Sequence, residues 1–238
     1  MSDVRDVTQH ISQRFNAELR HLHNQVLGMG GLVEEQLANA ITALTDGDEQ
    51  LAKKVYNNDY TVNALEVSID EECTQVIVRR QPAASDLRLI MAVIKTINDL
   101  ERIGDEAEGI ARQSIKISGL TQKHSISFIH LSERVREVLH GALDAFARSD
   151  TDEAVNVIRS TFKIDDEYES LARQLMTYMM EDPRMIPIVL NLLWSARALE
   201  RIAAHTRNVC ENIIYFAKGM DVRHISLEQL EQQTLEQK

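Results

Sequence analysis

A four-residue segment occurs twice in this chain, each time within a run of helix-forming residues. Leu-Glu-Arg-Ile at residues 100–103 returns ninety-nine residues later, at residues 199–202. The flanking sequence repeats as well: residues 87–115 align without gaps on 186–214, and residues 43–55 align on 145–157 at an offset of 102. A repeat of about one hundred residues is too long for a solenoid unit and is typical of a duplicated domain. The chain is therefore predicted to be a tandem duplication.

Each copy is predicted to contain three long helices. Only three prolines and nine glycines interrupt the 238 residues, and hydrophobic residues recur at alternating three- and four-residue spacing, which is typical of an amphipathic helix. No strand pattern is present. The chain is thus predicted to be all-α, with two antiparallel three-helix bundles. The expected helices span residues 15–44, 51–76 and 87–118 in the first copy, and 128–146, 155–180 and 187–218 in the second.

The helix ends and the repeat boundaries follow from local signals. Asp48 is expected to cap the second helix, and Ser85 or Asp86 the third, because Ser and Asp side chains accept hydrogen bonds from the first free N–H groups. Gly219 is expected to end the last helix. The predicted units are residues 1–118 and 119–220, joined near Gly119. Residues 221–238 are expected to form a polar, frayed tail.

Composition limits the functions to be considered. The net charge of −11 and a pI near 5.2 argue against nucleic-acid binding, which needs clustered Lys and Arg. The longest hydrophobic runs, residues 89–94 and 188–194, are far shorter than the ~20 residues of a membrane-spanning helix. The first fourteen residues do not look like a signal peptide. A soluble, cytoplasmic protein is expected, in which Cys73 and Cys210 are reduced core thiols.

Acidic residues replace hydrophobic ones within the expected third helix of the first copy. Glu101 and Asp105 continue its buried row, and their carboxylates should project from one face about one turn apart. Asp59 similarly interrupts the row of the second helix, and Asn63 follows four residues later. If these two helices are neighbours, the four side chains converge.

Clustered carboxylates repel one another and require compensation when they are buried. Arginine or lysine side chains, solvent or a metal ion can supply it. Oxygen ligands suit Mg²⁺, Mn²⁺, Ca²⁺ or iron, so the interpretations that remain open are a metal site, a solvated groove and an ion-paired cluster. In the second copy Glu200 matches Glu101 and Asp165 matches Asn63, but Thr161 stands at the position of Asp59 and Ala204 at that of Asp105. A metal site there is expected to be degraded.

No sequence motif indicates an enzyme. The chain contains no Walker A sequence, no GxGxxG, no HExxH and no paired Cys/His spacing. We therefore expect no catalytic residues and no required cofactor, although a divalent cation or iron remains a candidate ligand of the carboxylates.

Several segments resemble the PhoU family of phosphate-signalling accessory proteins. The likeness runs from about His10 to residue 224 and is most specific in RQPAASDLRLIM (80–91) and LERIGD (100–105). The resemblance implies a fold of two three-helix repeats, each with an E(D)xxxD pair on its second and third helices that binds metal in some members. Glu101, Asp105 and Asp59 match this pattern, whereas Asn63 departs from it. In the second copy Asp165 and Glu200 match.

The resemblance also implies a function. Such proteins couple the high-affinity phosphate ABC transporter, through its ATPase subunit, to a phosphate-sensing histidine kinase, and they repress uptake and the phosphate-starvation response. It implies a homodimer that reaches the membrane only through its partners. The docking face is expected on the third helix of each copy and its flanks. The alternatives are a metal-dependent hydrolase or oxidase and a metal buffer, each using Glu101 and Asp105.

Overall fold

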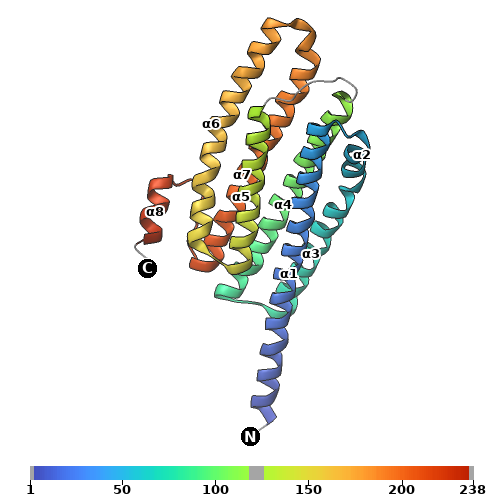
Figure 1. The fold of residues 1–238 in the computed structure, drawn as a ribbon. Coiled ribbons are helices and arrows are strands. Elements are labelled where there is room, and N and C mark those ends of the chain that lie inside the picture. Colours follow the sequence, from blue (N-terminus) through green and yellow to red (C-terminus); the bar gives the residue numbers. More distant parts are fainter. Residues whose placement is uncertain (1–2, 118–125, 236–238) are drawn as a thin grey trace.

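The chain folds into a bundle of long helices. The computed structural model describes residues 3–117 and 126–235, so the junction expected near Gly119 lies outside the described residues. Within them all regular structure is helical, which confirms the predicted all-α class (Figure 1). The elements are α1 (Asp3–Asp46), α2 (Glu49–Asn58), α3 (Tyr60–Arg80), α4 (Ala84–Ile117), α5 (Ile126–Arg148), α6 (Thr151–Glu181), the short 3₁₀ helix η1 (Pro183–Met185), α7 (Ile186–Lys218) and α8 (Leu227–Leu235).

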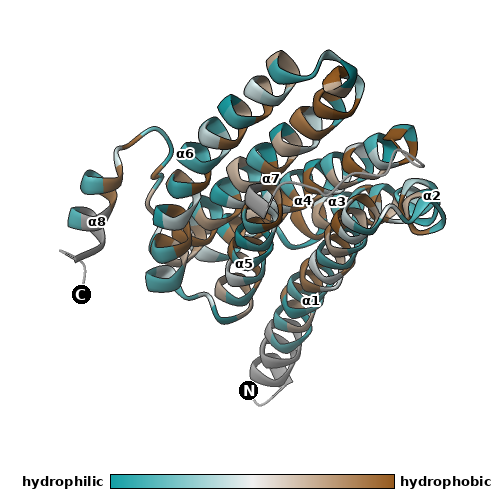
Figure 2. Cartoon of the chain, turned by 45° about the horizontal axis from the view of Figure 1, so that its top comes forward, coloured by the Kyte–Doolittle hydropathy of each residue, from teal (hydrophilic) through white to brown (hydrophobic). Residues whose placement is uncertain are grey.

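The two predicted repeats are visible as two bundles. In the first, α1, α4 and the consecutive helices α2 and α3 pack together, and in the second α5, α6 and α7 do so. The predicted hydrophobic rows supply most of the core: Val26, Met29 and Val33 of α1 are fully buried, and their counterparts Phe128, Leu131 and Val135 of α5 are at most 1% exposed. Figure 2 shows the resulting alternation of hydrophobic and hydrophilic segments along each helix.

The two duplicated cap positions are both occupied by Asp. Asp48 Oδ1 accepts hydrogen bonds from the backbone N–H groups of Gln50 and Leu51, each at 3.0 Å, as predicted. Asp150, 102 residues later, caps α6 in the same way, with bonds of 3.1 and 3.0 Å. The prediction for the third helix was wrong. Because α4 already begins at Ala84, neither Ser85 nor Asp86 precedes it as a cap.

The end of the chain also differs from the expectation. Gly219 ends α7 with φ at 74° and donates its N–H to the Tyr215 carbonyl, as predicted. Beyond it, however, the expected frayed tail contains a helix, α8, that packs against α6. Val222 and Leu230 are each 3% exposed. Burial of these two apolar side chains packs a segment for which the Glu- and Gln-rich composition had predicted a frayed tail.

The expected second helix of the first copy is divided at Asp59. The Asp59 carbonyl accepts from the N–H of Val62 at 2.9 Å and from that of Asn63 at 3.3 Å, so the backbone tightens at this turn. Hydrophobic spacing did not reveal the division, because Val55 and Val62 are seven residues apart and both remain buried. The division lies at one of the predicted site residues.

The third helices of the two repeats pack against each other in antiparallel directions. His205 Nδ1 lies 3.0 Å from Asp99 Oδ1, and Arg201 Nη1 lies 3.0 Å from Glu106 Oε1. These pairs set a register in which the two Leu-Glu-Arg-Ile segments lie at nearly the same level along the α4–α7 contact. The recurring segment therefore marks the centre of the contact between repeats.

Both cysteines lie in the core, as predicted. Cys73 and Cys210 are free thiols with no exposed surface. Burial raises the pKa of the Cys73 thiol to about 12, and it also raises the pKa of Cys210. In the part of the chain that the structure describes, no helix is long and apolar enough to cross a membrane.

A candidate acidic site and its altered copy

The four residues predicted to converge in the first repeat lie together where α1, α3 and α4 meet. Asp59 Oδ2 accepts a hydrogen bond from the Asn63 amide at 3.1 Å. Gln36, from α1, donates to Asp59 Oδ1 at 2.7 Å and to the Gly104 carbonyl at 3.2 Å. Gln36 was not predicted, because its place within the buried row of α1 gives no sign that its amide reaches another helix.

On α4, burial and neighbouring acids disfavour the charged forms of the two carboxyl groups. Partial burial raises the pKa of the Glu101 carboxyl, and the nearby charges of Asp105 and Glu66 raise it further. Asp105 is exposed rather than part of the buried row, but the desolvation that its carboxyl does undergo raises its pKa, and the charge of Asp59 raises it further. Glu66 is a fifth member of the cluster that the sequence analysis missed. It lies seven residues after Asp59 on α3, which is a helical spacing that could have indicated it.

Gly104 allows α3 to approach α4 closely. A Cβ atom at this position would lie 3.3 Å from Val62 Cγ1 and 3.5 Å from Asp59 Oδ1. The absence of a side chain thus brings Asp59 against the α4 backbone. In the second repeat the equivalent residue is Ala203, and there Thr161 stands in place of Asp59.

The donor atoms of this cluster suit a hard cation, but they are not arranged as a finished metal site. Asn63 Oδ1 is buried and lacks a hydrogen-bond partner, and the raised carboxyl pKa values indicate uncompensated charge. Against this, both Asp59 oxygens already accept hydrogen bonds from amides. Among the described residues, no three His, Cys, Asp or Glu side chains are grouped as metal ligands. The first-repeat metal site therefore stays a prediction.

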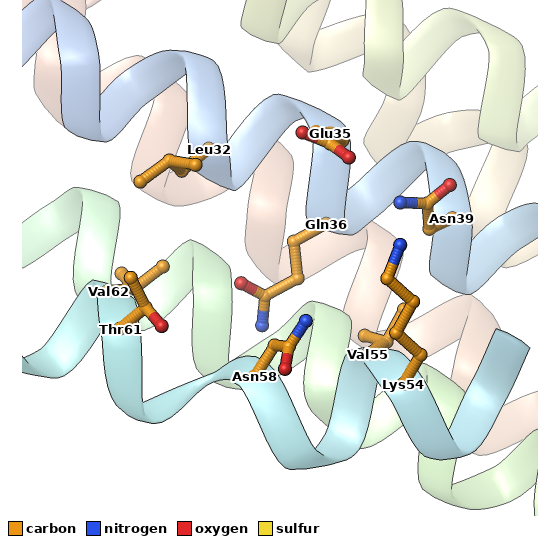
Figure 3. A pocket seen from close by; sticks show the side chains of 9 residues that line it. All are labelled: Leu32, Glu35, Gln36, Asn39, Lys54, Val55, Asn58, Thr61 and Val62. Carbon is orange, nitrogen blue, oxygen red and sulfur yellow. The ribbon is translucent and has the colours of Figure 1, made fainter.

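A small pocket adjoins the cluster on the side of α2 (Figure 3). Gln36 extends from α1 toward the segment that carries Asn58, and the pocket has a volume of about 120 Å³. Pockets for organic ligands usually measure roughly 300–1,000 Å³. The space beside the acidic cluster therefore does not suit an organic substrate.

In the second repeat the corresponding place is filled by arginine. Arg207 Nε donates to Thr161 Oγ1 at 2.9 Å, and Arg207 Nη2 donates to Asp165 Oδ2 at 3.0 Å. Glu200 lies 3.0 Å from Arg197. The predicted residues Asp165 and Glu200 are thus each paired with an arginine, and in the described part of the chain no hydrogen bond or ion pair joins them to each other.

The position of Arg207 in the sequence could have indicated that it lies near the second-repeat acids. It occupies the position that matches Glu108 in the row of Glu101 and Asp105. His205 of the second repeat contacts Asp99 on α4, to which Asn208 also donates a hydrogen bond at 2.9 Å.

The comparisons with known proteins agree with the duplicated architecture. A family model described as the PhoU domain matches residues 26–114 and, a second time, residues 128–213. A protein of Serratia marcescens named phosphate-specific transport system accessory protein PhoU is 52% identical over 95% of this chain and 93% of its own length. The protein of the same name from Escherichia coli K12 is 50% identical over 96% of this chain and 95% of its own.

Solved structures show the same fold. The crystal structure of PhoU from Pseudomonas aeruginosa superimposes with a TM-score of 0.84 at 47% identity, over 87% of this chain and all of that one. The phosphate transport system regulatory protein PhoU from Streptococcus pneumoniae gives a TM-score of 0.82 at 28% identity, over 87% of this chain and 99% of that one. With two matched domains and relatives of this similarity along nearly its whole length, the chain belongs to the PhoU family.

Proposed function

We propose that this chain is an accessory protein of a phosphate transport system and acts as a non-enzymatic cytoplasmic adaptor. In this role it couples the ATPase subunit of the high-affinity phosphate ABC transporter to a phosphate-sensing histidine kinase. It negatively regulates both phosphate uptake and the phosphate-starvation response. The observation that carries the proposal is the match to relatives named as accessory proteins of this transport system over 93% and 95% of their own length.

Exposed hydrophobic side chains supply candidate docking surfaces at the two ends of the molecule. On α7, Ile186, Leu190 and Trp194 form a stripe at four-residue intervals, and Trp194 is 64% exposed. Met180, at the end of α6, is 77% exposed beside the same turn. We call this surface, Met180, Ile186, Leu190 and Trp194, the α6–α7 tip; Figure 2 shows hydrophobic segments at this end of the hairpin.

The first repeat carries an equivalent surface. Val78, Leu87 and Met91 are exposed at the turn between α3 and α4, at positions that match Met180, Ile186 and Leu190. Because α4 and α7 are antiparallel, the two turns lie at opposite ends of the bundle (Figure 1). Elsewhere, the contact between α4 and α7 covers one face of the third helices, which were expected to dock partners. Two separate apolar ends suit an adaptor that holds two partners, or one partner and a second copy in a homodimer.

Coupling of this kind requires no chemistry at the adaptor. An adaptor that binds one conformation of the kinase more tightly than another shifts the kinase toward it by the difference in binding free energy. The proposed repression when phosphate is plentiful is a shift of this kind toward the inhibitory state of the kinase.

The test is a binding assay with the purified ATPase subunit and the cytoplasmic part of the kinase. Wild type is compared with Leu190→Glu/Trp194→Glu and with Leu87→Glu/Met91→Glu, and exposed Asp166→Asn on α6 serves as the control. We expect wild type and the control to bind, and each pair of charges to weaken at least one partner by tenfold or more. Binding of neither partner by wild type, with or without Mn²⁺, would falsify the adaptor function.

One observation favours a second role, as a metal-binding helical bundle. The buried, unpaired Asn63 Oδ1 beside carboxylates of raised pKa provides a place where a divalent cation would relieve an electrostatic cost. Titration calorimetry with MnCl₂ on wild type and Glu101→Ala/Asp105→Ala tests it. Heat of binding in both proteins, or in neither, would contradict the first-repeat site.

A further inference from the structure

The second repeat holds a cation that belongs to the chain itself. The Arg207 guanidinium makes hydrogen bonds to Thr161 and Asp165, and its central carbon lies 4.2 Å from the centroid of the Phe162 ring. Its side chain is 22% exposed. Two hydrogen bonds, one of them to a carboxylate, and an aromatic face together hold an arginine in one position.

The partners of Arg207 are the counterparts of the residues at the centre of the first-repeat cluster. At the offset of 102 that relates the second helices, Thr161 matches Asp59 and Asp165 matches Asn63. At the offset of 99 that relates the third helices, Arg207 matches Glu108. The Glu108 carboxylate is instead bound by Arg112, one turn away, at 2.8 Å. The guanidinium therefore binds the second-repeat counterparts of Asp59 and Asn63. In the first repeat, the described residues include no cationic side chain bonded to Asp59 or Asn63.

We propose that Arg207 is the resident counter-charge of the second repeat and prevents a divalent cation from binding there, so that any metal site of this chain is confined to the first repeat. A divalent ion would meet the fixed positive charge of the guanidinium, which its hydrogen bonds and the Phe162 ring hold in place. Asp165 is already bound to the guanidinium, Glu200 is paired with Arg197, and Ala204 offers no donor atom.

The electrostatic states of the two clusters agree with this difference. In the first repeat, burial and neighbouring acids raise the pKa of both Glu101 and Asp105. In the second, each predicted acid has an arginine within 3.0 Å. The second repeat thus supplies its own counter-charge at Asp165, whereas Glu200 Oε2, although 3.0 Å from Arg197 Nη1, is buried without a hydrogen bond.

The experiment restores ligands to the second repeat with and without the arginine. All variants carry Glu101→Ala/Asp105→Ala, so that only the second repeat can respond. One adds Thr161→Asp/Ala204→Asp and keeps Arg207, and the other adds Arg207→Gln to these two changes. Each is titrated with MnCl₂ by calorimetry, and its Tm is measured with Mn²⁺ and with a chelator.

We expect one Mn²⁺ per chain in the variant with Arg207→Gln, and binding at least tenfold weaker where Arg207 is retained. Only the first should show a rise in Tm with Mn²⁺. Equal affinity in the two variants would overturn the proposal, as would no binding in either. Mn²⁺ binding by the Glu101→Ala/Asp105→Ala background that is lost on Asp165→Ala would overturn it as well.

Thr161 is fully buried, and a charge at a buried position destabilises the fold. The same comparison can then be made between Ala204→Asp and Ala204→Asp/Arg207→Gln, which leave Thr161 in place, and circular dichroism verifies that both are folded. Arg207→Lys, which keeps a positive charge, is the matched control and should bind no Mn²⁺. The measurement reports metal binding alone, so its outcome is independent of the proposed docking to transporter and kinase.

Discussion

At the scale of single residues, Glu101 shows how the acidic cluster links pH to stability. Its carboxyl is half-buried, and burial together with Asp105 and Glu66 raises its pKa above the ordinary value of 4.5. The folded protein therefore binds this proton more tightly than the unfolded chain does. The carboxyl imposes no cost below the unfolded pKa, and its cost is complete once the pH exceeds the folded pKa.

Replacing Glu101 by Gln should consequently stabilise the metal-free protein at neutral pH but not in acid. We expect the free energy of unfolding of Glu101→Gln, relative to wild type, to increase as the pH rises from 4 to 7. The gain should be about 0.5 kcal/mol, because solvent screens a half-exposed charge. Urea unfolding at several pH values, with a chelator present, measures it. Asp166→Asn, outside the cluster, should show no such trend, and a constant offset for Glu101→Gln would contradict the assignment.

The residues of the site differ in how far the sequence could predict them. Asp59, Glu101 and Asp105 were identified because acids interrupt hydrophobic rows, and the helical period brings those rows together. Gln36 was not, because a glutamine in a buried row has no unique partner until the distance between α1 and α3 is known. Arg207 was missed for a related reason: its row position is evident, but the direction of a long side chain depends on which acceptors the neighbouring helix presents.

At the scale of helices, the duplicated caps give a matched pair of perturbations. Asp48 and Asp150 each accept two backbone hydrogen bonds at the start of the helix that follows. Removing either side chain leaves these N–H groups without their acceptor. Replacing an Asp cap by Ala costs about 1 kcal/mol, whereas Asn caps almost as well.

We therefore expect Asp48→Ala and Asp150→Ala each to lower the free energy of unfolding by about 1 kcal/mol, and the double variant by about 2 kcal/mol, because the sites are distant. Chemical denaturation monitored by circular dichroism measures the change. Asp48→Asn and Asp150→Asn should remain within a few tenths of a kcal/mol of wild type. Equal losses for the Asn and Ala variants would show that the charge, and not the hydrogen bonding, stabilises these helix starts.

Helix boundaries were predictable where side-chain chemistry enforces them. Asp48 begins a helix through the hydrogen bonds of its own side chain, and Gly219 ends a helix because its backbone adopts a positive φ angle. Both predictions are confirmed. The start of α4 was not predictable, since Gln81 and Ala84 adopt positive φ angles, 47° and 50°, that their side chains do not favour. Local propensity therefore does not indicate that turn.

At the scale of the whole molecule, the repeats share one interface along α4 and α7. A repeat of about one hundred residues, in a sequence poor in Pro and Gly, predicted two helical bundles. Nothing in either copy indicated that the third helices of the two bundles would face each other. The ion pairs Asp99–His205 and Glu106–Arg201 join them, and α1 also contacts α5 across the boundary. Contact of this extent should make the two repeats unfold as one cooperative unit.

A cavity placed far from the interface tests this cooperativity. Ile69 is fully buried on α3, which among the described elements contacts only α1, α2 and α4. Ile69→Ala should cost about 2–5 kcal/mol. If the repeats unfold together, the slowest backbone amides of α6, in the other repeat, should exchange with deuterium faster by the same factor as those of α1. Val67→Ala, at a half-exposed position on the same helix, should change neither. Acceleration confined to α1 would show instead that each repeat unfolds as a separate domain, despite the α4–α7 contact.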